Sequence, residues 1–171
     1  HIAPGLFRND QSFIYWSQHQ PSLWEKLRAQ ALNEIKPLHH PIQGTDHQDR
    51  LIRIAQQNAD KAGVGRFIQF EKKSLRDCRP IADKGLIITN PPYGERLSDA
   101  TPLIPLYQEL GKTSHDYFQN WQLAFITSNP LLAKATGLRA SKHYSFYNGA
   151  IECKLYCLAL NSQNQLKNKT Q

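Results

Sequence analysis

The chain has 171 residues, of which 40% are hydrophobic, and this is enough for one ordinary globular domain with a core. Lys and Arg number 21 against 14 Asp and Glu, and the net charge of +7 favours a polyanionic partner such as nucleic acid without identifying one. No apolar run approaches the roughly 18 residues that cross a membrane, and no signal peptide is recognisable, so we expect a cytoplasmic protein.

The predicted elements alternate between helices and strands. A helix is expected at 22–36, where Ser22 and Glu25 have the spacing of a capping box. A strand at 41–46 and a helix that closes at Gly63 come next. The following expected elements are strands at 66–70, 85–89 and 123–127, a helix through Leu103, Tyr107 and Leu110, and a short helix from Asn129-Pro130 to Gly137.

The C-terminal part is predicted to form a β-hairpin. Residues 144–147 and 150–160 have strand character, and Asn148-Gly149 between them is the strongest short-range signal for a two-residue type I′ turn. Alternating strands and helices before a hairpin indicate an α/β fold, whose mostly parallel sheet is closed at one edge by antiparallel strands. We expect residues 1–160 to form this domain and the polar residues 161–171 to be a tail or linker.

Cysteine and histidine usage argues against disulfide and metal sites. The three cysteines form no CxxC pair and fit a reducing compartment. Cys153 and Cys157 lie about 13 Å apart in a strand-like run, which is too far to bridge. The seven histidines show no metal-ligand spacing, so we assign no metal.

Positive charge is densest at Lys72, Lys73, Arg76 and Arg79. This basic cluster could face phosphates, but a solvated surface explains it equally well. Charge alone therefore assigns no site.

The stretch Asn90-Pro91-Pro92-Tyr93 follows the apolar strand at 85–89, at the strand end where α/β sheets bind ligands. An exocyclic amine is a poor nucleophile because its lone pair is delocalised, so a catalyst must hold both amino hydrogens out of the plane. The side-chain oxygen of Asn90 and the backbone carbonyl of Pro91 can supply two fixed acceptors, because the proline rings restrict φ. Tyr93 can then stack on an extruded base.

A structural alternative exists for this stretch, because prolines after a strand often only end it, and Asn before Pro commonly forms a turn. Asn129-Pro130 illustrates that alternative in the same chain. There the asparagine is expected to cap a helix, and no aromatic residue follows directly. The four-residue version favours an amine-binding site.

Residues 90–97, NPPYGERL, resemble the signature of amino-group methyltransferases that use S-adenosylmethionine and have a Rossmann-like sheet. NPPY alone is shared by adenine-N6 DNA, guanine-N2 RNA and release-factor glutamine methyltransferases. The extension Gly94-Glu95-Arg96-Leu97, together with PIQGTD at 41–46 and the segment 1–16, is similar to the amino-terminal module of the bacterial bifunctional enzymes that methylate guanine N2 in large-subunit (23S) ribosomal RNA. The resemblance runs over nearly the whole chain and implies direct in-line methyl transfer.

The resemblance also implies cofactor contacts. Asp46, beside Thr45, matches the acidic residue that accepts both ribose hydroxyls, although a carboxylate there can instead cap the following helix. The family's acidic contact to the adenine amine falls on Ser74, with Asp77 three residues further on, and the sequence does not choose between them. Asn90 would border the cofactor as well as the amine.

The family's first motif, an acidic residue and a glycine-rich turn after the first strand, does not occur in this sequence and would precede His1. The resemblance thus implies a fragment of a larger enzyme, with an RNA-binding module and a second methyltransferase elsewhere. We expect an S-adenosylmethionine-dependent rRNA (guanine-N2)-methyltransferase. The alternatives are adenine-N6 methylation of DNA and a non-catalytic nucleic-acid-binding remnant.

Overall fold

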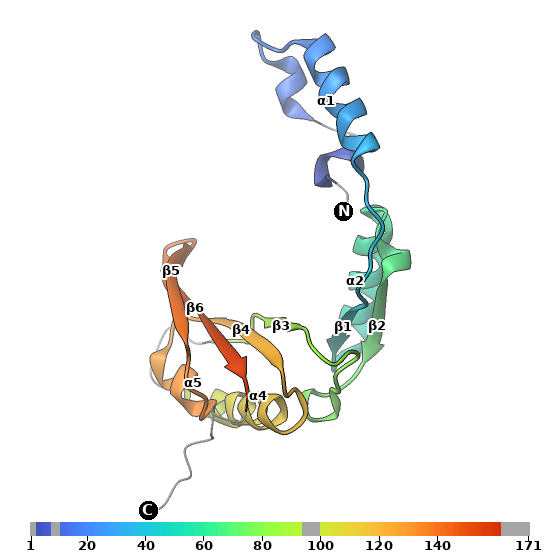
Figure 1. Cartoon of the computed structure of the whole chain (residues 1–171). Coiled ribbons are helices and arrows are strands. Elements are labelled where there is room, and N and C mark those ends of the chain that lie inside the picture. Colours follow the sequence, from blue (N-terminus) through green and yellow to red (C-terminus); the bar gives the residue numbers. More distant parts are fainter. Residues whose placement is uncertain (1–2, 8–10, 94–99, 162–171) are drawn as a thin grey trace, which may run out of the picture. The chain divides into compact units, whose positions relative to one another are not determined.

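The computed structural model describes residues 3–7, 11–93 and 100–161, and the chain falls into two compact units, His1–Lys72 and Lys73–Gln171 (Figure 1). The single domain expected at 1–160 stays a prediction. Residues 94–97 of the motif and 162–171 of the expected tail lie outside the described residues. None of the described helices is long and apolar enough to cross a membrane.

The first unit begins with two short 3-10 helices, η1 (Pro4–Phe7) and η2 (Ser12–Tyr15), and the helix α1 (Pro21–Asn33). The helix is confirmed, but the predicted capping box is wrong. Proline has a fixed φ that suits the first helical position, so the helix begins at Pro21 and Ser22 already lies in its first turn. The ring of Phe13 packs edge-on against Trp24, with 4.9 Å between centroids.

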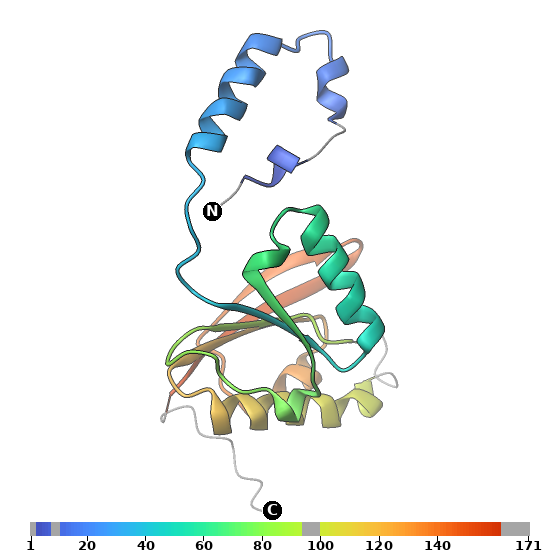
Figure 2. The ribbon, with the colours of Figure 1, turned by 90° about the vertical axis from the view of Figure 1, so that its right-hand side faces the viewer.

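The rest of this unit is a strand–helix–strand arrangement, in which α2 packs along a parallel pair of strands (Figure 2). Its elements are β1 (Ile42–Asp46), α2 (Asp49–Lys61), η3 (Gly65–Phe67) and β2 (Ile68–Lys72). The predicted helix end is confirmed, because Gly63 follows α2 with a φ of 69° that favours glycine. The strand expected at 66–70 starts later, since residues 65–67 form a 3-10 turn.

The second unit contains a four-stranded sheet in the order β3-β4-β6-β5. The pair β3–β4 is parallel, whereas β4–β6 and β5–β6 are antiparallel. This confirms the predicted α/β sheet that antiparallel strands close at one edge. The strands are β3 (Leu86–Thr89), β4 (Trp121–Thr127), β5 (Lys142–Asn148) and β6 (Ile151–Leu160).

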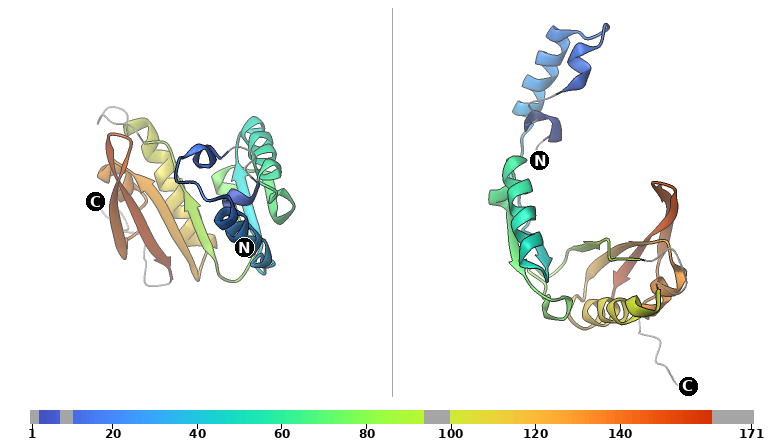
Figure 3. Two further views of the ribbon diagram at one scale, coloured as in Figure 1. Left: turned by 90° about the horizontal axis from the view of Figure 1, so that it is seen from above. Right: turned by 180° about the vertical axis from the view of Figure 1, so that it is seen from behind.

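One face of this sheet carries the core, and α4 lies along it (Figure 3). Leu123 and Phe125 alternate with solvent-facing or opposite-face residues of β4, so both reach α4, where each buried side chain contributes about 1.5–3 kcal/mol. Gly111 of α4 lets α5 approach closely, because a Cβ there would lie 1.8 Å from the carbonyl oxygen of Thr136. The helices are η4 (Leu75–Asp77), η5 (Thr101–Leu103), α4 (Ile104–Tyr117) and α5 (Pro130–Ala135).

The C-terminal hairpin is confirmed, but its turn lies one residue later than predicted. Asn148 pairs with Ile151, so the two turn residues are Gly149 and Ala150. A type I′ turn requires positive φ at both positions, whereas here only Gly149 has it, at 63°, which is the pattern of a type II′ turn. Asn148 is therefore the last residue of β5, and its side chain belongs to a face of the sheet.

Candidate functional site

The predicted amine-binding residues follow β3, at the carboxyl end of the parallel pair β3–β4. Pro91 is buried and Pro92 is exposed, while Tyr93 is half-buried. Asn90 is exposed, and among the residues that the structure describes its amide has no hydrogen-bond partner. The turn is thus packed into the unit through Pro91 and presents the Asn90 amide to solvent.

A buried tyrosine of α4 holds the main chain of this turn. The Tyr107 hydroxyl donates to the backbone carbonyl of Pro92 over 3.3 Å, and it also hydrogen-bonds with the Thr127 side chain at the end of β4. Burial raises the pKa of Tyr107, so the hydroxyl keeps its proton and stays a donor at neutral pH. The helical stripe in the sequence identified Tyr107 as a core residue but gave no sign of this contact.

The tyrosine of the motif is held at its hydroxyl end by the hairpin. Asn148 Nδ2 donates to Tyr93 Oη over 2.9 Å, and Cys153 Sγ donates to the same oxygen over 3.5 Å. The ring also packs against the hydrophobic core. Asn148 was missed as a site residue because the sequence assigned it to the turn.

A cavity of about 250 Å³ lies beside the end of β4, lined by Ser128, Pro130, Glu152, Lys154 and Tyr156. The last three are two residues apart along β6, so they share the face of the sheet that carries Thr127. A carboxylate, an ammonium and a phenol in one cavity suit a ligand with both hydrogen-bond donors and acceptors.

The predicted ribose contacts lie in the first unit and so belong to a separate part of the structure. Asp46 is the last residue of β1, and its Oδ1 accepts from the backbone N–H of Gln48 over 2.7 Å. It does not cap α2, whose N-cap is Gln48, so that alternative is wrong: the carboxylate shapes the turn instead. Thr45 is exposed. The role of both residues stays a prediction.

The two candidates for the adenine contact form one pair. Ser74 Oγ donates a hydrogen bond to Asp77 Oδ2 across η4. A carboxylate that already accepts from a hydroxyl still has lone pairs for a second donor. Both candidates thus belong to one hydrogen-bonded pair, and the adenine contact of either residue stays a prediction.

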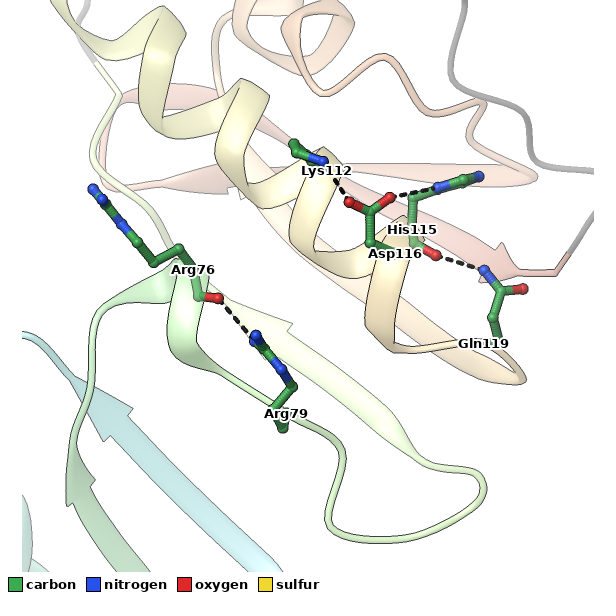
Figure 4. A network of polar contacts seen from close by, with 6 residues as sticks. All are labelled: Arg76, Arg79, Lys112, His115, Asp116 and Gln119. Carbon is green, nitrogen blue, oxygen red and sulfur yellow. Dashed lines mark hydrogen bonds and ion pairs between the residues drawn. The ribbon is translucent and has the colours of Figure 1, made fainter.

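The basic cluster makes contacts within the second unit. Arg79 lies over the ring of Tyr117, 3.6 Å from its centroid. It also donates to the backbone carbonyl of Arg76 (Figure 4). Arg76 pairs with Glu109 at 3.1 Å. These contacts support the structural interpretation of the two arginines.

The neighbouring face of α4 carries a second polar network. Lys112 donates to Asp116 over 2.6 Å, and His115 Nδ1 lies 3.1 Å from the same carboxylate (Figure 4). The hydrogen bond from Lys112, followed by that with His115, lowers the pKa of Asp116. These side chains of α4 therefore pair with one another at neutral pH, which favours a structural role for the network.

Comparison with known proteins identifies the family. Residues 1–157 match the family described as RMKL-like, methyltransferase domain. Over 168 residues the chain is 57% identical to "Ribosomal RNA large subunit methyltransferase K/L" of Legionella pneumophila subsp. pneumophila strain Philadelphia 1. The match covers 98% of this chain and 24% of that protein, so the chain spans about a quarter of the length of the curated relatives it matches.

Solved structures share the fold. The structure of "SMU.472, a putative methyltransferase complexed with SAH" superimposes with a TM-score of 0.79 at 28% identity, over 90% of this chain and 41% of that one. A "predicted N6-adenine-specific DNA methylase" from Listeria monocytogenes str. 4b F2365 superimposes with a TM-score of 0.77 at 32% identity, over 92% of this chain and 40% of that one. The chain therefore has an α/β methyltransferase fold.

Proposed function

Because the chain belongs to the RMKL-like methyltransferase domain family (UPF0020), we propose that it presents a guanine N2 amine of large-subunit ribosomal RNA for methylation by S-adenosylmethionine. The observation that carries this proposal is the Asn90 amide, which the fold exposes at the end of β3 on a turn of two prolines. An acceptor that the protein does not use internally is available to a ligand.

Each residue of the turn after β3 has its own proposed role in binding the amine. Asn90 Oδ1 and the Pro91 carbonyl accept the two amine hydrogens, which rotates the nitrogen lone pair out of conjugation and toward the methyl group. Pro92 keeps this geometry because its φ is fixed and Tyr107 holds its carbonyl. Tyr93 supplies the stacking surface for the base. The bound cofactor contributes an electrophilic methyl group, and the protein contributes mainly positioning.

The proposed cofactor residues fit the chemistry of S-adenosylmethionine. Asp46, with Thr45 beside it, offers a carboxylate to the ribose hydroxyls, and its Oδ1 contact to Gln48 fixes the orientation of that carboxylate. The Ser74–Asp77 pair offers an acceptor to the adenine amine. Asn90 would adjoin the sulfonium end. The SAH bound to SMU.472 supports this cofactor.

The ribosomal RNA substrate is supported by the name of the Legionella relative and by the net charge of +7. The name of the Listeria structure favours a second candidate, methylation of adenine N6 in DNA. Two acceptors above a stacking ring suit either planar amine, so the choice between them needs an experiment.

The test uses the full-length gene product with radiolabelled S-adenosylmethionine, offered either protein-free 23S ribosomal RNA or plasmid DNA. We expect label in the RNA only, recovered as N2-methylguanosine after digestion to nucleosides. Label in adenine of the DNA would overturn the guanine assignment. No transfer to either substrate, together with no heat of binding for the cofactor in calorimetry, would overturn the enzyme assignment and leave a nucleic-acid-binding remnant.

A further inference from the structure

The ring that is proposed to stack on the base does not point freely into solvent, because the hairpin holds its hydroxyl. We propose that Asn148 is a positioning residue: its amide fixes the phenol of Tyr93 and, through it, the ring against which the target base stacks. This inference rests on the proposed function. It adds to the site a residue that lies 55 positions after Tyr93 in the sequence.

The register of the hairpin creates this contact. Phe146 pairs with Cys153, and side chains two residues apart in a strand share a face, so Asn148 lies on the same face as Cys153. Donors from both strands therefore converge on one oxygen, Tyr93 Oη, at 2.9 Å from Asn148 and 3.5 Å from Cys153. Had the turn been Asn148-Gly149, as its sequence predicts, the amide would not belong to this face.

Tyr93 is also held at its other end. The carbonyl of the preceding Pro92 accepts from Tyr107, which is anchored in α4 and fully buried. With the main chain fixed by a helix and the phenol fixed by a hairpin, rotation of the ring about its side-chain bonds is restricted at both ends. A ring that is already ordered loses less conformational entropy when a base stacks on it, and it holds the base at a defined distance from the acceptors.

The hydrogen bond from Asn148 to Tyr93 is better explained by a functional role than by a structural one. Asn148 is exposed at the end of β5. Removing an exposed hydrogen bond has little effect on stability, whereas loss of ring orientation acts directly on the reacting geometry. The effect of substitution should therefore appear in catalysis before it appears in folding.

The experiment is a double-mutant cycle in the full-length gene product, with methyl transfer to ribosomal RNA as the readout. Asn148→Ala and Tyr93→Phe each remove one partner, and we expect each to lower kcat about three- to tenfold with the KM for S-adenosylmethionine unchanged. The double variant should be no worse than the poorer single variant, because both substitutions delete the same bond.

Two further variants separate positioning from a general effect. Asn148→Asp can accept from the Tyr93 hydroxyl in place of donating to it, and it should recover part of the lost kcat. Tyr147→Phe is the matched control, since it removes a neighbouring phenol that is 72% exposed and belongs to the opposite face of β5, and it should keep full activity.

Additive losses in the cycle, or full activity in Asn148→Ala, would overturn the role of Asn148. We expect all variants to have the same melting temperature. A fall in kcat of Asn148→Ala that is explained by a lower melting temperature would also overturn the role of Asn148. Failure of the proposed function gives a different result: transfer to adenine in DNA would exclude guanine, while the same non-additive cycle on that substrate would still support Asn148.

Discussion

Two Asn-Pro turns end neighbouring parallel strands of the same sheet, and they treat their asparagines in opposite ways. After β4, Asn129 is 8% exposed, its N–H donates to Thr127 Oγ1, and its Oδ1 accepts from the N–H of Leu131 over 2.9 Å. After β3, Asn90 is exposed and has no such partner among the described residues. Asn129 is thus hydrogen-bonded within the protein, whereas the Asn90 amide is available to a ligand.

The second proline explains the difference. Asn129 caps α5 because Leu131, two residues later, has a backbone N–H to donate. The residue two positions after Asn90 is Pro92, which has no N–H. Pro92 thus takes away the N–H donor that would otherwise bond to the Asn90 oxygen. Asn90 therefore cannot form the capping hydrogen bond that Asn129 forms with Leu131.

The largest effect that tests this comparison is expected from Asn90→Ala. Deleting the side chain removes one of two acceptors for the amine, and loss of one such preorganised partner costs about 10²- to 10³-fold in kcat. The melting temperature should stay within error, because an exposed amide without internal partners adds little stability. Methyl transfer and thermal unfolding of the same preparation measure the two quantities. Retained transfer in the variant would remove Asn90 from the mechanism.

A smaller loss is expected from Pro92→Ala, which gives Asn90 a potential capping partner and so makes the first turn resemble the second. An internal hydrogen bond to the Asn90 oxygen must break before the amine binds, and this should lower kcat/KM about tenfold. Steady-state kinetics with ribosomal RNA measure it. Pro130→Ala is the matched control, because it also exchanges a proline of an Asn-Pro turn but leaves the Asn129–Leu131 bond in place. Equal losses in both variants would argue that only rigidity matters.

The reciprocal change is Asn129→Ala, which should affect stability rather than catalysis. Loss of a helix N-cap costs about 0.5–2 kcal/mol of the free energy of unfolding, measured by urea denaturation. Asn129→Asp keeps an acceptor for the Leu131 N–H and should recover most of that loss. A large fall in kcat for Asn129→Ala at unchanged stability would show that the second turn also binds the ligand.

Local chemistry allowed much of this fold to be predicted. The strand at 123–127 is an apolar run because most of its residues are buried, and Gly63 ends α2 because a glycine backbone accepts that φ without strain. The position of Asn90 at a strand end followed from the same reasoning. Where two local signals competed the prediction failed, as at α1, where Pro21 fixed the helix start and displaced the capping box.

Long-range pairing decided what the sequence could not show. The Asn148-Gly149 dipeptide predicts its own turn, but β5 and β6 pair in a register that sets Asn148 opposite Ile151, so the turn lies one residue later. The contacts that hold the candidate site, from Tyr107 to Pro92 and from Asn148 to Tyr93, join elements 15 and 55 residues apart. No spacing rule within one element reports such contacts.

The smallest expected effect concerns the residue that touches both turns, since Tyr107 bonds with Pro92 after β3 and with Thr127 at the end of β4. Burial raises the pKa of its phenol above the ordinary value of 10.0. Below pH 10 both folded and unfolded chains keep the proton, whereas at higher pH the unfolded chain loses it first, so the free energy of unfolding falls as pH rises toward the folded pKa. Tyr107→Phe should therefore lose less stability between pH 9 and 11 than the wild type, in urea titrations at each pH.

The control for this pH dependence is Tyr147→Phe, which deletes a phenol hydroxyl that is 72% exposed on the surface of β5. Tyr156 and Lys112 also have raised pKa values, through burial and through the hydrogen bond to Asp116 respectively, and they contribute a slope of the same sign in every variant. Only the difference between wild type and Tyr107→Phe therefore reports on Tyr107. If that difference vanishes, burial does not raise the pKa of the Tyr107 phenol, and Tyr107 makes no contribution to the pH dependence of stability.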